Sequence, residues 1–204
     1  DRLGDLGLIE IIRGSLVNAE KMCGRSLKTY EEIGHTVGIA NQLGNLGLVA
    51  ARRNDAKGAR CFFERSFELN RTLGRKKGMA DQLSNIGNIK MEEGHLDRAD
   101  NNFSRSFKIY LSLHDQKGMS IQIGNRGIVA YLKRDLNSAE RSFMESLRIS
   151  DLIGYNEGSA NQTTNLGVVA QARRDFALAL KHWRRALALF TEIGAKPRMA
   201  QVQS

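Results

Sequence analysis

The chain has 204 residues and a formal net charge of +9, which is compatible with acidic partners. Its 41% hydrophobic and 26% charged residues are typical of a folded chain, and its single proline favours long, uninterrupted helices. The sequence has no apolar run long enough to span a bilayer, and Cys23 and Cys61 lack the spacing of a metal or redox site. We therefore expect a cytoplasmic protein with two reduced thiols.

A motif returns every forty residues along the chain. Residues 41–50 read NQLGNLGLVA, residues 81–90 read DQLSNIGNIK, and related segments begin at 121 and 161, with a diverged copy at 3–8. A fixed period of this size indicates an array of structural repeats. We expect one array with repeats at 1–37, 38–77, 78–117, 118–157 and 158–197. Residues 198–204 would then begin a further helix.

Each repeat predicts two helices. In the second repeat the first helix covers residues 38–53, and the second follows Asp55 and ends at about residue 73. The apolar stripes expected to face the core are Leu43, Leu46, Gly47 and Ala50 on the first helix, and Ala59, Phe62, Phe63, Phe67 and Leu73 on the second. Asp55 can cap the second helix through its carboxylate, and Gly74 can end it in a left-handed conformation.

The same positions keep their character through the array. One small residue recurs without exception, as Ala19, Ala59, Ala99, Ala139 and Ala179. Four residues further on stand Cys23, Phe63, Phe103, Phe143 and Trp183. The glycine between repeats recurs as Gly34, Gly74, Gly154 and Gly194, with His114 as the exception.

The pattern of Leu46-Gly47, Ala59 and Phe63 resembles the tetratricopeptide repeat (TPR) family, whose usual period is about 34 residues. The longer period and the Asn-Leu-Gly motif are similar to the Pins/LGN adaptors and kinesin light chains. Leu43 and Ala50 replace the aromatic residues usual on the first helix. The resemblance implies an all-α, right-handed solenoid that binds a partner segment in its concave groove.

Catalytic and metal sites are not indicated. His35, His95, His114 and His182 occupy different phases of the repeat, without a second ligand at helical spacing. The Gly-Asp-Leu-Gly segment at 4–7 follows no predicted strand and precedes no Lys-Ser/Thr pair, so it does not match a phosphate-binding loop. We expect neither enzymatic activity nor a cofactor.

The face of each first helix opposite the apolar stripe carries the candidate binding site, because asparagine can both donate to and accept from a peptide backbone. The candidate peptide-binding residues are Asn41, Asn45, Asn85, Asn88, Asn125, Asn161, Asn165 and Arg52. Glycine or serine beside them would let a ligand approach closely. Alternatively, these asparagines bond to the neighbouring repeat and only hold the stack together. The latter role is expected for Gln42, Gln82, Gln122 and Gln162.

The resulting hypothesis is a protein-interaction scaffold or adaptor. The alternatives are a peptide-sensing regulatory module of a larger signalling protein and a structural block of a large assembly. The groove has glycine, serine or threonine where chaperone-binding TPRs place their first lysine, which argues against capture of chaperone tails.

The second helices carry a column of basic residues, which has two possible interpretations. Its members are Arg25, Arg65, Arg105 and Arg185. It is either a solvated face or an edge that attracts acidic partners. Nucleic acid is not favoured, because no ladder of aromatic residues accompanies the charges. Apolar ends predict either a piece of a longer array or end-to-end self-association.

Overall fold

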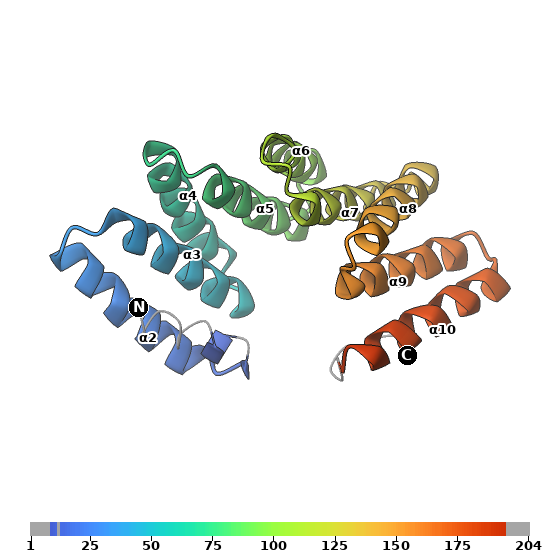
Figure 1. The fold of residues 1–204 in the computed structure, drawn as a ribbon, viewed down its shortest axis with the longest axis horizontal. Helices are drawn as coiled ribbons and strands as arrows, with labels where there is room; N and C mark the ends of the chain where they lie inside the picture. The colour runs from blue at the N-terminus through green and yellow to red at the C-terminus, as the bar shows by residue number, and fades with distance from the viewer. Residues whose placement is uncertain (1–8, 12, 195–204) are drawn as a thin grey trace. The chain divides into compact units, whose positions relative to one another are not determined.

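A computed structural model describes residues 9–11 and 13–194, which form helices and turns and contain no strand. The named helices are α2 (Leu16–Glu32), α3 (Thr36–Arg52), α4 (Ala56–Thr72), α5 (Lys76–Glu92), α6 (Leu96–Ser112), α7 (Gln116–Leu132), α8 (Leu136–Leu152), α9 (Asn156–Ala172) and α10 (Phe176–Glu192) (Figure 1). We call α3, α5, α7 and α9 the leading helices and α2, α4, α6, α8 and α10 the trailing helices. The all-α prediction is therefore confirmed for this part of the chain.

The predicted helix boundaries are close to the observed ones. Helix α3 begins at Thr36, two residues before the predicted start, and α4 ends at Thr72, one residue before the predicted end. Leu73 is the C-cap residue and is 38% exposed, so its predicted place on the core face is wrong. The predicted helix from 198 and the motif at 3–8 lie outside the described residues.

The packing divides the chain into two units, residues 1–106 and 107–204, with the division inside α6. In the first unit α3 packs on α2 and α4, and α4 packs on α5. In the second unit α8 packs on α7 and α9, and α9 packs on α10. The prediction that residues 1–204 form one continuous array stays a prediction.

In the second to fifth repeats the core contains a ring packed against a glycine. A Cβ built on Gly47 would lie 2.4 Å from Phe63 Cε1, and the same clash joins Gly87 to Phe103 at 2.5 Å. In the second unit the corresponding distances from Gly127 to Phe143 and from Gly167 to Trp183 are 2.6 and 2.3 Å. The leading and trailing helices therefore approach closely only because these positions lack a side chain. The alanine column packs beside the rings and is fully buried at Ala19, Ala59, Ala99, Ala139 and Ala179.

The ends of the helices follow the predicted chemistry. Asp55 Oδ1 accepts a hydrogen bond of 2.8 Å from the Gly58 amide, which confirms its capping role. Asp115, Asp135 and Asp175 cap α7, α8 and α10 in the same way. The inter-repeat glycines have a left-handed φ of 66° to 67°. His114 adopts this conformation with a φ of 53°, although a Cβ makes it unfavourable.

A column of buried serines connects trailing helices to leading helices by hydrogen bonds. This role was not predicted from the sequence. Ser106 Oγ donates to the Ala80 carbonyl at 2.8 Å, and Ser146 Oγ donates to the Ser120 carbonyl at 2.7 Å. Both serines have no exposed surface. Each buried hydroxyl is thus satisfied by the helix on which it packs.

Candidate functional site

The predicted binding asparagines lie on the leading helices, at the edge of the buried face. Asn45, Asn85, Asn125 and Asn165 are half-buried, one on each of α3, α5, α7 and α9. Asn88 and Asn161 are also half-buried, whereas Asn41 and Arg52 are exposed. The six half-buried asparagines are therefore neither sealed in the core nor fully solvated.

Three of the four asparagines in the main column are oriented by a glutamine one turn earlier. Asn85 Nδ2 donates to Gln82 Oε1 at 3.4 Å, and Asn165 Nδ2 donates to Gln162 Oε1 at 3.2 Å. The same bond on α3 joins Asn45 to Gln42 at 3.4 Å. Within the described residues the Oδ1 atoms of these asparagines accept no hydrogen bond, so each can accept one from a ligand N–H.

Two of the glutamines, Gln82 and Gln162, are buried against the preceding leading helix. A Cβ built on Gly44 would lie 3.3 Å from Gln82 Nε2, and one built on Gly124 would lie 2.6 Å from Gln162 Nε2. The four glutamines are at most 8% exposed. Their contacts therefore match the structural role expected for this column.

In the second unit, residues at α7, α9 and α10 line a cavity of about 400 Å³ that is open to solvent. Asn125 of α7 and Asn161 and Asn165 of α9 all line it. The predicted residues Asn41, Asn45, Asn85, Asn88 and Arg52 belong to the first unit and do not line this cavity. Three of the eight candidates are thus brought to one site.

The rest of the cavity lining is a mixture of apolar and polar groups. Ile121, Ile128 and Tyr155 supply apolar surface, and Ser120 and Glu157 add polar groups. The lining contains one carboxylate and no lysine or arginine. Its charge therefore gives no support to an acidic ligand at this position.

The Tyr155 side of the cavity shows an exchange of side chains between two positions of the fourth repeat. Tyr30 packs its ring on Gly38 of the following leading helix, and Tyr110 does the same on Gly118. Ser150 stands at the corresponding place and bonds to Ser120 at 2.7 Å between the two Oγ atoms. The ring over Gly158 comes instead from Tyr155, which lines the cavity.

Tyr155 is a site residue that the sequence reasoning missed. The signal in the sequence was weak, because the column that has Tyr30, Tyr110 and Phe190 holds Ser150 in this repeat but is also interrupted by Asn70 in the second repeat. Lys117 Nζ lies 4.4 Å from the Tyr155 ring centroid, within the range of a cation–π interaction. This contact covers the ring with a lysine from α7.

Two of the remaining candidates have protein partners. Arg52 Nη1 donates to the main-chain carbonyl of Ile11, and Asn41 Oδ1 accepts a bond of 3.0 Å from Arg75 Nη1. The first contact joins successive repeats, and the second joins α3 to the residue that precedes α5, as the stacking interpretation expects. Asn88 and Asn125 make no side-chain hydrogen bond within the described residues.

Other kinds of site were sought in the same part of the chain. Among the described residues, no group of three or more His, Cys, Asp and Glu side chains could hold a metal ion. Burial and the neighbouring Arg185 and Lys181 lower the pKa of His182 on α10. No described helix has both the length and the apolar character needed to cross a membrane.

Comparison with known proteins gives matches at the level of structure. No family model and no curated protein matches the sequence. The chain is similar to a crystal structure of BtubC (BKLC) from P. vanneervenii, with 17% identity, a TM-score of 0.77, and coverage of 94% of this chain and 80% of that one. For a putative kinesin light chain with TPR-like repeats from Podospora anserina the values are 9% identity, a TM-score of 0.71, and 96% coverage of both chains.

A third similar structure contains a peptide. It is the Rap conjugation gene regulator of the plasmid pLS20 in complex with the Phr* peptide, with 15% identity and a TM-score of 0.83. The match covers 97% of this chain and 55% of that one. At these identities the likeness shows the fold. The chain has the TPR-like helical-repeat fold that its forty-residue period predicts.

Proposed function

We propose that the chain binds a segment of a partner protein on the face formed by its leading helices. The observation that carries this proposal is the cavity between α7, α9 and α10, where Asn125, Asn161 and Asn165 stand beside the apolar side chains of Ile121 and Ile128. Sites for small ligands and peptide side chains combine apolar surface with a few placed polar groups in this way.

The asparagines would hold the backbone of the partner segment. The Oδ1 of Asn165 accepts a hydrogen bond from a backbone N–H, because its Nδ2 is already directed at Gln162. Asn125 offers both its donor and its acceptor. The apolar groups, with Tyr155, receive one side chain of the segment. The Rap regulator, which contains the Phr* peptide, adds support through its similar fold.

A regulatory role is the second candidate. The similar protein of pLS20 is described as a gene regulator, and the present chain spans 55% of it. In that case the same cavity would bind a signalling peptide and control an attached effector. The two candidates share the binding step and differ in its consequence.

The binding step can be tested with peptides selected from a phage-displayed random library on the wild-type chain. We expect the selected peptides to lose at least about tenfold in affinity when Asn125→Ala and Asn161→Ala are combined, because two of the three asparagines that line the cavity lose their polar groups at once. Fluorescence polarisation measures the affinity, and circular dichroism checks that helicity and melting are retained.

The matched control combines Asn18→Ala on α2 with Asn137→Ala on α8, both exposed positions outside the cavity. It should bind the peptides as the wild type does. The proposal is wrong if no peptide is selected, or if both double variants bind equally well. Loss of helicity in the cavity variant alone would favour the stacking role of the asparagines.

A further inference from the structure

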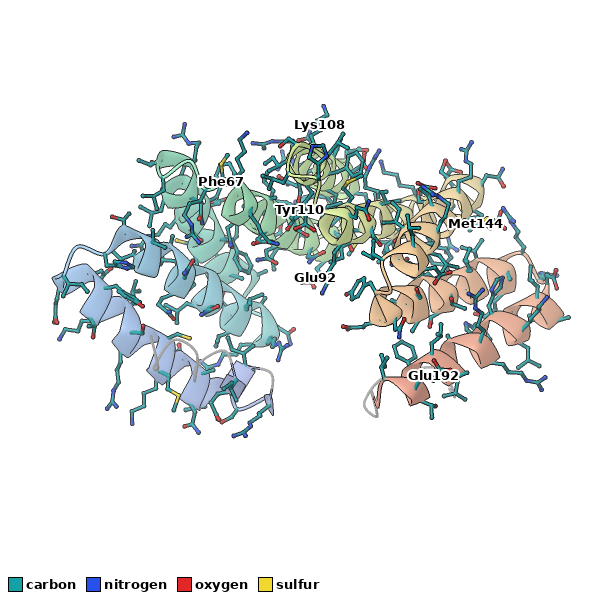
Figure 2. The ribbon with its side chains drawn as sticks, viewed as in Figure 1. Phe67, Glu92, Lys108, Tyr110, Met144 and Glu192 are labelled. Atoms are coloured by element: carbon teal, nitrogen blue, oxygen red, sulfur yellow. The ribbon has the colours of Figure 1, made fainter. Side chains whose placement is uncertain are left out.

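A second cavity, of about 530 Å³, lies in the first unit on the side of the trailing helices. It is bounded by α4 and α6, with α5 behind them, and it shares no residue with the cavity of the second unit. Leu83 and Ile86 of α5 and Phe67 of α4, which is labelled in Figure 2, supply its apolar surface. This cavity is therefore separate from the binding site proposed above.

The cavity includes a position whose side chain differs from repeat to repeat. Asn102 lines it at the position that holds Met22, Phe62, Ser142 and His182 in the other repeats. Phe62 packs against the core cluster of Ala50, Ala59 and Phe63. Asn102 instead turns back along its own helix, where Nδ2 donates to the Arg98 carbonyl at 3.0 Å. The aromatic volume of the second repeat is therefore missing at this point in the third.

Two arginines on α6 stand at the cavity without a carboxylate partner. Neither Arg98 nor Arg105 forms an ion pair within the described residues. The Cζ atom of Arg105 lies 6.0 Å from the centroid of the Phe67 ring, so the guanidinium is held over the apolar wall. A guanidinium in this position keeps its hydrogen-bond donors available for an anion.

The other charged groups of the lining already have partners. Lys90 Nζ lies 2.6 Å from Glu93 Oε2, and Glu64 Oε1 lies 3.9 Å from Arg60 Nε. Asp97, in the first turn of α6, also takes part in an interaction within the protein. The charge left for a ligand is therefore positive, and it comes from Arg98 and Arg105.

We propose that this cavity is a second protein-binding site, which takes an acidic amphipathic segment of a partner. An apolar side chain of the segment packs on Phe67, Leu83 and Ile86, and its Asp or Glu residues pair with Arg98 and Arg105. Arginine binds carboxylates through two parallel hydrogen bonds, and a buried apolar anchor beside such pairs gives an interface most of its affinity. The net charge of +9 attracts this kind of partner from a distance.

The second site is independent of the function proposed for the leading-helix face. The cavity of the second unit has no lysine or arginine in its lining, whereas this one has three cationic residues. The two sites should therefore select different peptides. A chain with both sites could bind two segments at once.

The test begins with the Asn125→Ala/Asn161→Ala variant, in which the first site is disabled. Peptides selected on it from a phage-displayed random library should carry Asp or Glu around a Leu or aromatic residue. Their affinity, measured by fluorescence polarisation, should fall at least about tenfold when Arg98→Glu and Arg105→Glu are added. Asn102→Phe, which places a ring in the cavity, should weaken binding while all charges are kept.

The matched control adds Lys181→Glu and Arg184→Glu on α10, two exposed cations outside both cavities, and so changes the net charge equally. It should retain most of the affinity. Equal losses in the two charge variants would overturn the proposal in favour of general charge attraction. Failure to select acidic peptides, or full binding by Asn102→Phe, would also overturn it.

Discussion

Ser66 Oγ donates a hydrogen bond of 2.7 Å to the main-chain carbonyl of Ala40, which lies 26 residues earlier. The bond joins the trailing helix α4 to the leading helix α3 and is fully buried at the serine. Because the same bond recurs from Ser106 and Ser146, it is a structural element of the repeat. Ala186 occupies the equivalent place on α10, so the position also accepts a side chain without a hydroxyl.

Ser66→Ala should therefore lower the free energy of unfolding by about 0.5–1.5 kcal/mol, the net value of one buried hydrogen bond. Urea denaturation followed by circular dichroism measures the change. Ser112→Ala is the control, since Ser112 is exposed and bonds only within its own helix. Equal effects from the two substitutions would contradict the assigned role.

Gly47→Ala should destabilise the chain by about 1–3 kcal/mol, since the new Cβ would meet the Phe63 ring in a packed core. Combining it with Phe63→Leu should recover part of the loss, because the smaller side chain makes room. Gly24→Ala on α2 is a matched control, as no atom lies within 4 Å of a Cβ built there. It should stabilise the helix by about 0.5–1 kcal/mol. Two losses of similar size would rule out the steric explanation.

His114→Gly should raise the melting temperature, because His114 has a φ of 53° and a Cβ disfavours this conformation by about 1–2 kcal/mol. The greater freedom of glycine in the unfolded chain offsets part of the gain. Gly74→Ala should have the opposite effect, because Gly74 has a φ of 66°. Differential scanning calorimetry distinguishes the two directions, and a lower melting temperature for His114→Gly would refute the argument.

Cys23 and Cys61 should react at different rates with iodoacetamide. Cys61 is exposed, whereas Cys23 is buried, and burial raises the pKa of the Cys23 thiol. Since the thiolate is the reacting form, the raised pKa and the lack of access both slow Cys23. Mass spectrometry after timed alkylation at pH 8 should show modification of Cys61 first, and of Cys23 only when denaturant is added. Equal rates in the native chain would mean that the Cys23 environment is open.

The sequence was sufficient for the helices because the determinants of the fold recur. The glycine at Gly47 and an aromatic ring at the place of Phe63 return in phase in each later repeat, so the same steric requirement could be recognised several times. The Asp55 cap and the Gly74 turn were predicted for the same reason. The serine at Ser66 was equally periodic, but a small polar residue on a helix does not show by itself whether it faces the core or solvent.

The cavities were harder to predict because they are lined at positions where the side chains differ from repeat to repeat. Ser150 and Tyr155 exchange roles over Gly158, and Asn102 lacks the volume of Phe62. The size of the space that such changes leave depends on side-chain rotamers and on the positions of neighbouring helices. A comparison of residues at equivalent repeat positions gives no information on either. The asparagine column could be placed on the correct helices, but the bonds to Gln82 and Gln162 required coordinates.

The reach of the contacts between helices has a consequence for how the chain folds. The hydrogen bonds that join one helix to another span 26 residues from Ser66 to Ala40 and 41 residues from Arg52 to Ile11. Contacts of about one period give a low contact order, which favours rapid folding. Folding can then nucleate in any neighbouring pair of repeats and spread outward. Duplication of a whole forty-residue unit would also preserve each of these pairings, so the chain can lengthen without a new folding pathway.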